Sequence, residues 1–252
     1  GMGHRLLPSE INFRANIYGF RQLGVHRVVS ASAVGSMREE IQPLHIVVPD
    51  QMLDRTVSRS MTFFGEGVVA HVSLAEPFCD DLRQALIGAA GRAGARTHPR
   101  GTYLCIEGPQ FSTRAESRLY RSWNVDVIGM TNLPEARLAR EAELCYATMA
   151  LVTDYDCWRE AEEGVTLEEV LSNLRRNAET AVAAVRELVR SLERPRRCAC
   201  GSALATALIT QPPFAAAARR RLGLLLERYD RRAVRPRSTR SRRAARVAGG
   251  RG

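Results

Sequence analysis

The sequence contains no lysine. All 37 of its basic side chains are arginine, and with 27 acidic side chains they give the 252-residue chain a formal net charge of +10. Sixteen of these arginines lie in residues 194–252, beside two acids only, so this segment carries +14 while residues 1–193 carry −4. The basic character therefore belongs to the last segment, which argues against a protein that binds nucleic acid over its whole surface.

Long apolar runs and closely paired metal-binding cysteines are also missing. No apolar run approaches the roughly 18 to 20 residues of a membrane span, and the first residues lack the apolar region and cleavage pattern of a signal peptide. Six cysteines occur, but none forms a C-x-x-C pair, so we expect free thiols and no structural zinc site. The Cys198-Ala199-Cys200 pair is interpreted as two reduced thiols, with a redox-active disulfide as the alternative. These absences together predict a cytoplasmic protein without a membrane segment.

Helical and strand patterns alternate along the body. Helical patterns cover residues 10–23, 78–94, 112–123, 133–144 and 166–192. Apolar and β-branched runs at 25–33, 45–49, 102–106, 126–130 and 146–153 predict strands. This alternation favours an α/β fold with a largely parallel sheet.

The chain is expected to change character after residue 193. Residues 1–193 form one predicted domain, and 194–229 add short helices at 198–210 and 214–229. Residues 230–252 are arginine, alanine, serine and glycine with almost no apolar side chains, so they are expected to be a disordered arginine-rich tail.

Polar residues cluster at the predicted carboxyl ends of strands. They are Ser32-Ala33, Glu107, Met130-Thr131 and Thr153-Asp154. In open α/β sheets ligands bind at this edge, so four segments are candidates for one pocket. The same residue types also form turns and helix caps, which is the alternative interpretation.

Four stretches carry a resemblance to a known family. They are Ser32–Glu40, Glu107–Ser117, Gly129–Glu135 and Thr153–Trp158. In this order and spacing they resemble the trimeric purine nucleoside phosphorylase family, within its S-methyl-5′-thioadenosine phosphorylase branch. The resemblance extends from Gly1 to about Leu192 and more weakly to Tyr229. It implies a three-layer α/β/α fold with a mixed central sheet.

The resemblance also implies a reaction. Family members transfer a pentosyl group in purine and methionine salvage: phosphate displaces adenine from the 5-methylthioribose, and the products are adenine and 5-methylthioribose 1-phosphate. Inorganic phosphate is the co-substrate, with no metal or organic cofactor. The family's partners are a nucleoside and a second and third copy of the chain, because the active site lies at the interface of a homotrimer.

The family's site residues carry over to matching positions. Ser32, Ala33 and Thr131 match phosphate contacts, while Met130 and Phe111 match residues near the ribose. The purine side is matched by Ser112, Thr153, Asp154 and Asp156. A carboxylate accepts a hydrogen bond from the 6-amino group of adenine, and a carboxyl that carries a proton assists the departing base.

An apolar slot is implied for the methylthio group. Matching positions are Val165, Leu167, Val170 and Leu171, and His71 matches a histidine that reaches the pocket from the neighbouring subunit. Without the resemblance, the four apolar residues are an ordinary amphipathic helix face and His71 is a structural histidine.

The beginning of the sequence departs from the family. Members carry a glycine-rich phosphate loop and an Arg-His-Gly-x-x-His motif, but here the chain starts at what looks like that glycine, with His4 following. We therefore expect a truncated member that lacks its N-terminal strands, with weak or no phosphorolysis, since a buried phosphate needs a cation. The alternatives are a phosphorylase for methylthioinosine or 6-oxopurine nucleosides, an inactive fragment, and a protein that binds anionic surfaces or nucleic acid through 230–252. Nucleic acid is the least favoured partner, since no aromatic side chains interleave with that tail.

Overall fold

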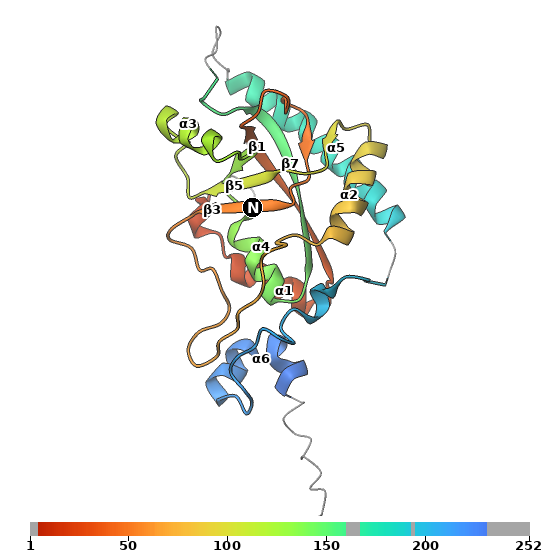
Figure 1. Ribbon diagram of the computed structural model, residues 1–252. Helices are drawn as coiled ribbons and strands as arrows, with labels where there is room; N and C mark the ends of the chain where they lie inside the picture. The colour runs from red at the N-terminus through yellow and green to blue at the C-terminus, as the bar shows by residue number, and fades with distance from the viewer. Residues whose placement is uncertain (1–4, 160–166, 193–194, 231–252) are drawn as a thin grey trace, which may run out of the picture.

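A mixed sheet organises the chain (Figure 1). The computed structural model describes residues 5–159, 167–192 and 195–230, and within them seven strands pair in the order β3-β5-β6-β1-β7-β2-β4. The strands are β1 (Arg27–Ser36), β2 (Ile46–Val47), β3 (Gln51–Arg55), β4 (Thr97–His98), β5 (Thr102–Ile106), β6 (Val127–Gly129) and β7 (Cys145–Tyr155). The α/β class and the mixed sheet implied by the resemblance are therefore confirmed.

The two long strands β1 and β7 form the centre of the sheet. They run parallel, with Arg27 opposite Cys145 at one end and Ser36 opposite Tyr155 at the other. On their outer sides both partners are antiparallel, since β6 pairs with β1 and β2 pairs with β7 in opposite directions. Four of the six strand pairings are parallel, so the prediction of a largely parallel sheet is confirmed. The alternation of elements does not reveal that β6 and β2 join the central pair in the opposite direction.

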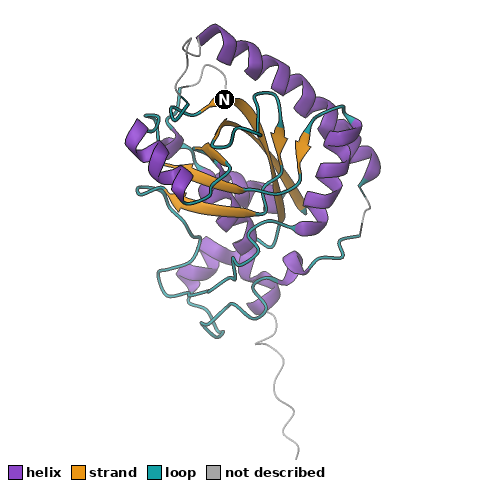
Figure 2. Cartoon of the chain, turned by 45° about the horizontal axis from the view of Figure 1, so that its top comes forward, coloured by secondary structure: helices purple, strands orange, loops and turns teal. Residues whose placement is uncertain are grey.

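Helices cover both faces of this sheet (Figures 1 and 2). They are α1 (Phe13–Gln22), α2 (Asp80–Arg92), α3 (Arg114–Ser122), α4 (Asn132–Glu141), α5 (Leu167–Ser191), α6 (Ala216–Asp230) and the 3-10 turns η1 (Pro8–Glu10) and η2 (Ala199–Ser202). Strand β7 shows the layering, because alternate residues enter different cores. Ala147 and Met149 pack with side chains of α2 and α5, whereas Tyr146 and Val152 pack with those of α1, α4 and α6.

The sequence located most elements within a few residues and missed two. Strands β3 and β4 form the two edges of the sheet, and neither contains a fully buried side chain. An edge strand needs little apolar content, so Gln51–Arg55 and Thr97–His98 carry no strand pattern. The helix predicted over 198–210 was also wrong: only η2 forms there, and Ala70 pairs in a β-bridge with Leu208.

The C-terminal part of the described chain joins the main core. Leu222 and Leu225 of α6 belong to the same buried cluster as Tyr146. None of the described helices is long and apolar enough to cross a membrane. The expected arginine-rich tail, apart from Asp230, lies outside the described residues.

Candidate active site

A cavity of about 700 Å³ lies over the carboxyl-terminal halves of β1 and β7. It is lined by Arg5, Leu6, Leu7, Pro8, Ala31, Ser32, Ala33, Val34, Gly35, Ile106, Pro109, Phe111, Ser112, Ile128, Gly129, Met130, Thr131, Thr153, Asp154, Asp156 and Leu174. All nine residues expected to contact phosphate, ribose or purine within one chain are in this set. The structure thus brings together segments that are separated by more than 100 positions in the sequence.

The central strands carry the site along their length and not only beyond their ends. β1 continues four residues past Ser32, and β7 includes Thr153 and Asp154 before it ends at Tyr155. The register of the two strands shifts between Val34 and Gly35. A Cβ on Gly35 would come within 3.2 Å of Asp154 Oδ1, so the missing side chain makes room for the carboxylate.

Hydroxyl groups meet at one side of the cavity. Ser32 Oγ lies 2.9 Å from the hydroxyl of Tyr103 and 3.2 Å from Thr131 Oγ1. Tyr103 is fully buried, and a Cβ on Gly129 would overlap its hydroxyl, so only glycine lets this ring reach Ser32. Hydroxyls that are held in this way can donate to the oxygens of an anion.

A buried arginine fixes the loop that carries Met130 and Thr131. The guanidinium of Arg59 donates to the carbonyl oxygens of Met130 at 2.5 Å, Leu133 at 2.6 Å and Glu107 at 2.6 Å. It also lies 3.6 Å from the Glu107 carboxylate, which compensates its charge. These contacts join the end of β5 to the start of α4, so Arg59 positions the loop without lining the cavity.

The loop is held from its other side by Asn132. The hydroxyls of Tyr146 and Thr148 on β7 both donate to Asn132 Oδ1, at 2.9 Å and 2.8 Å. Asn132 is completely buried. The position of Thr131 is therefore set by buried polar contacts on both sides of it.

Two carboxyl groups lie at the other side of the cavity. The Thr153 hydroxyl donates to Asp154 Oδ2 at 2.6 Å, and the buried Ser117 of α3 donates to Asp156 Oδ2. Burial raises the pKa of Asp154, the Thr153 hydroxyl offsets part of this, and the negative charge of Asp156 raises the pKa further. Burial likewise raises the pKa of Asp156, with the Ser117 hydroxyl opposing. Both groups therefore retain a proton at higher pH than an exposed aspartic acid.

Aromatic contacts hold the segment that contains Asp156. The Trp158 indole N–H donates to the Ser36 carbonyl oxygen at 2.7 Å, and the Asp156 backbone N–H donates to the same oxygen at 3.2 Å. The Arg121 guanidinium lies 3.6 Å from the centre of the Trp158 ring. Helix α3 thereby clamps the end of β7 through both Ser117 and Arg121.

Ser112 and Phe111 precede α3 and line the cavity with different exposure. The Ser112 hydroxyl is buried and has no hydrogen-bond partner among the described residues. Phe111 is 84% exposed. A buried unpaired hydroxyl beside an open aromatic ring suits a ligand that has both a polar edge and a flat face.

The predicted methylthio residues are located less fully. Val165 lies outside the described residues, and the side chains of Leu167 and Val170 are not described. Leu171 is exposed and is not among the lining residues, whereas Leu174, one turn later on α5, is. His71 also does not line the cavity of its own chain, and its backbone N–H donates to Ala207.

Sequence reasoning missed Arg5, Tyr103, Arg59, Ser117 and Leu174. Arg5 is the basic residue among the described residues that line the cavity. Ser117 lies inside a stretch that carried the resemblance, so a search for partners of Asp156 had a signal there. Tyr103 had none, because it looks like any aromatic residue of a buried strand.

Comparisons with known proteins agree with this geometry. Residues 2–190 match the Phosphorylase superfamily. The S-methyl-5′-thioadenosine phosphorylase of Koribacter versatilis is 56% identical over 230 residues, which cover 91% of this chain and 79% of the relative. That of Geobacter sulfurreducens is 55% identical over 231 residues, which cover 91% and 81%.

Solved structures show the same likeness. A methylthioadenosine phosphorylase from an antarctic soil metagenomic library has a TM-score of 0.85 at 49% identity, over 90% of this chain and 80% of that chain. A methylthioadenosine phosphorylase from Schistosoma mansoni in complex with adenine has a TM-score of 0.78 at 34% identity, over 83% and 82%.

Proposed function

The chain belongs to the phosphorylase superfamily, and on that premise we propose that it cleaves S-methyl-5′-thioadenosine with inorganic phosphate. The products are adenine and 5-methylthioribose 1-phosphate. The observation that carries this proposal is the pair of carboxyls with raised pKa, Asp154 and Asp156, which shares one cavity with the hydroxyls of Ser32 and Thr131. One side of the cavity suits a leaving purine and the other suits a phosphate.

Asp154 supplies the proton or strong hydrogen bond for the leaving base. As the C1′–N9 bond breaks, negative charge collects on the imidazole ring of the purine, and N7 is the atom that can receive a proton. Burial and the charge of Asp156 raise the pKa of Asp154, so the proton is retained near neutral pH more than in an exposed acid. The Thr153 hydroxyl orients the other oxygen of this carboxyl.

Asp156 selects the base. Its carboxylate accepts a hydrogen bond from the exocyclic 6-amino group of adenine, which a 6-oxopurine lacks. The Ser117 hydroxyl holds the acceptor in place, and Trp158 fixes the backbone on which it stands. The unpaired Ser112 hydroxyl provides a further contact for the ring edge.

Phosphate binds below the sugar, at the opposite side. The Ser32 and Thr131 hydroxyls and the backbone N–H of Ala33 donate to its oxygens, and Arg5 adds positive charge to the same cavity. A phosphate oxygen then forms the new bond to C1′ while the purine leaves from the other face. No metal or organic cofactor takes part in this scheme.

Apolar contacts hold the sugar and its methylthio group. Met130 packs a thioether against the ribose, and Leu174 of α5 provides a slot wall together with the leucines that precede η1. These leucines are exposed in the single chain, so a methylthio group that covers them gains apolar contact that the 5′-hydroxyl of adenosine does not provide.

The active unit in this proposal is a homotrimer. His71 does not line the cavity of its own chain and lies beside the bridge from Ala70 to Leu208. In the proposed assembly it would complete the cavity of a neighbouring chain. Light scattering coupled to gel filtration measures the mass directly. A monomeric chain that turns over substrate at a family-like rate would remove this part of the proposal.

A substrate panel tests the reaction. The full chain is incubated with methylthioadenosine, adenosine, methylthioinosine or inosine, with and without phosphate, and free base is measured by chromatography. We expect adenine release that requires phosphate and is fastest with methylthioadenosine, and the rate also tests the expectation of slow turnover. Faster release of hypoxanthine would instead favour a phosphorylase for 6-oxopurine nucleosides.

A further inference from the structure

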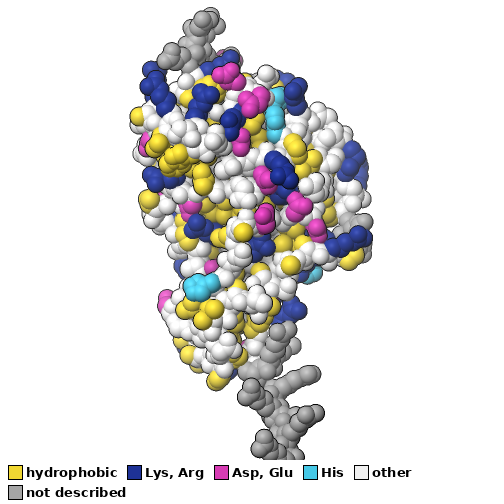
Figure 3. Space-filling model, in the orientation of Figure 1, with side chains coloured by type: hydrophobic (Ala, Val, Ile, Leu, Met, Phe, Trp, Pro, Cys, Tyr) yellow, Lys and Arg dark blue, Asp and Glu magenta, His cyan; other side chains and the backbone are white. Residues whose placement is uncertain are grey.

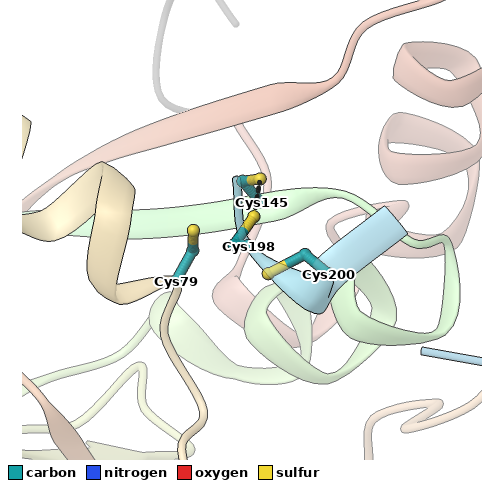
Figure 4. A group of neighbouring side chains, drawn as sticks. All are labelled: Cys79, Cys145, Cys198 and Cys200. Carbon is teal, nitrogen blue, oxygen red and sulfur yellow. Dashed lines mark hydrogen bonds between the residues drawn. The ribbon is translucent and has the colours of Figure 1, made fainter. Parts of the chain in front are cut away.

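Four cysteines from distant parts of the sequence meet at the amino end of the central strands (Figure 4). Cys79 precedes α2, Cys145 is the first residue of β7, and Cys198 and Cys200 flank the start of η2. Their four sulfur atoms all lie within 4.8 Å of one another. Cys145 Sγ and Cys198 Sγ are 3.3 Å apart.

This arrangement has the dimensions of a four-thiolate metal site. Zinc binds cysteine sulfur at about 2.3 Å in a tetrahedron, whose edges are then about 3.8 Å. The sulfur–sulfur distances, 3.3 Å for one pair and at most 4.8 Å for the others, lie within about 1 Å of that edge length. We propose that Cys79, Cys145, Cys198 and Cys200 bind one structural zinc ion.

The surroundings suit a site of this charge. Zinc with four thiolates carries a net charge of −2, and the Arg140 guanidinium lies 3.7 Å from Cys200 Sγ. Arg140 is held there by the carbonyl oxygen of Glu76, to which it also donates. A positive group so placed offsets the charge of the complex, as the partners around thiolate sites commonly do.

A metal ion also has a route to the cysteines. Cys79, Cys145 and Cys200 are buried, whereas Cys198 is partly exposed. Two cavities of about 310 Å³ and about 580 Å³ adjoin the cluster, and both are lined by Cys79 and Cys198. A preformed ligand set with an entry path is what a protein metal site requires.

The site would join three segments that the sheet does not join by itself. Cys79 belongs to the start of a helix on one face, Cys145 to the central strand, and the other two to the segment that leads to α6. A catalytic zinc site keeps one position open for water or substrate. Here all four ligands are protein thiolates, so the site is closed and stabilises structure. The expectation of no zinc site considered only cysteine pairs close in sequence, and such a test does not detect ligands that meet through folding.

Binding involves no oxidation. Four thiols lose their protons to solvent, four sulfur–zinc bonds form, and the metal stays divalent. The competing state is a pair of disulfides, in which an oxidant removes two electrons for each bond. Metal content and free-thiol count therefore separate the two states.

The test uses the full chain, purified without chelator. Elemental analysis by mass spectrometry is expected to find about one zinc per chain, and replacement by cobalt should give the strong visible absorption of tetrahedral cobalt thiolate. Cys79→Ser and Cys200→Ser should each lower zinc retention after dialysis by at least tenfold. Cys105→Ser, buried elsewhere, and Cys157→Ser, exposed, are matched controls that should retain it.

Two results would overturn the proposal. One is a chain with all six thiols reactive after denaturation that takes up neither zinc nor cobalt from an excess of metal. The other is a metal-free chain in which two or four thiols are missing from the count, which identifies disulfides. Both are measured on the unaltered chain, so they stand even if a serine variant fails to fold, and neither depends on cleavage of methylthioadenosine.

Discussion

The two ends of the β1–β7 pair differ in what they carry. At the carboxyl end the strands open into a cavity lined by hydroxyls, carboxyls and apolar side chains. At the amino end the same strands begin with Arg27 and Cys145, and Cys145 joins the four-cysteine cluster. Asp154 lies nine positions after Cys145 along the strand, about 30 Å at 3.3 Å per residue.

This difference assigns separate tasks to one pair of strands. At the carboxyl end, polar side chains line a cavity, and burial raises the pKa values of Asp154 and Asp156. This arrangement lowers the stability of the fold but supplies groups for a reaction. Side chains at the amino end are packed against helices or gathered as metal ligands. We therefore expect substitutions at the carboxyl end to change catalysis and those at the amino end to change stability.

The largest expected effect is at Asp154. Asp154→Asn removes the proton donor, so kcat/KM for methylthioadenosine should fall about 100-fold or more, and the preference should move toward 6-oxopurine nucleosides. Because no carboxylate then needs burial, the variant should unfold at the same or higher temperature near neutral pH. Asp81→Asn, an exposed acid beside the cysteines, is the control. An unchanged ratio of adenine to hypoxanthine release would remove the proton-donor role.

Metal removal should have its effect at the other end. If zinc is extracted with a strong chelator, the unfolding temperature should fall by about 5 °C or more, which corresponds to about 2 kcal/mol for a chain of this size. Per folded molecule, kcat should change less than twofold. Differential scanning calorimetry and turnover at low temperature measure the two effects. If the chelated chain unfolds at its normal temperature but has lost activity, the cysteine cluster serves catalysis and not stability.

Arg5 tests the phosphate side of the cavity. Arg5→Gln removes a positive charge from the lining, so KM for phosphate should rise about tenfold while KM for methylthioadenosine changes little. Initial rates at varied phosphate concentration give both constants. Arg14→Gln, on the exposed face of α1, should leave both unchanged. Equal effects of the two variants would mean that Arg5 acts only through net charge.

A smaller effect is expected at Leu174. Leu174→Ala enlarges the apolar slot, so the preference for methylthioadenosine over adenosine should fall about fivefold, since one or two methylene contacts contribute about 1 kcal/mol. The ratio of kcat/KM values for the two nucleosides measures this. Leu171→Ala, one turn earlier and exposed, is the matched control and should keep the ratio.

The smallest expected effect is a displacement of the pH profile. If the protonated Asp154 is the active form, kcat/KM falls as pH rises through its raised pKa. Besides burial, the negative charge of Asp156 raises that pKa. Asp156→Asn removes this charge, lowers the pKa of Asp154 and should move the falling limb to lower pH. A limb that stays in place would show that another group controls it.

Local sequence patterns predicted most of this fold, and their failures have physical causes. Thr102–Ile106 was predicted with its observed bounds because a buried strand in the interior of a sheet must be apolar. The edge strands β3 and β4 escaped because half-exposed residues carry little pattern. The antiparallel directions of β2 and β6 depend on how the chain returns to the sheet, and a short stretch of sequence does not contain this information.

The site residues were predictable where they lie close together in one sequence motif. Asp154 and Asp156 follow one strand, and their motif carried them to the cavity. Leu174 was missed by one helical turn, because an amphipathic face repeats and does not say which turn meets the ligand. The cysteine cluster was missed for a different reason, since its four members lie on three segments and only the folded sheet brings them together.

The hydroxyls of Tyr103, Ser32 and Thr131 form a row in which each group has one proton to give. Such a row has two possible directions, and neighbouring dipoles favour the same one. An anion that accepts from both Ser32 and Thr131 uses both of their protons, so Tyr103 is then the group that donates to Ser32. We therefore expect Tyr103, which is completely buried and does not line the cavity, to support phosphate binding through Ser32, and Tyr103→Phe would remove that donor.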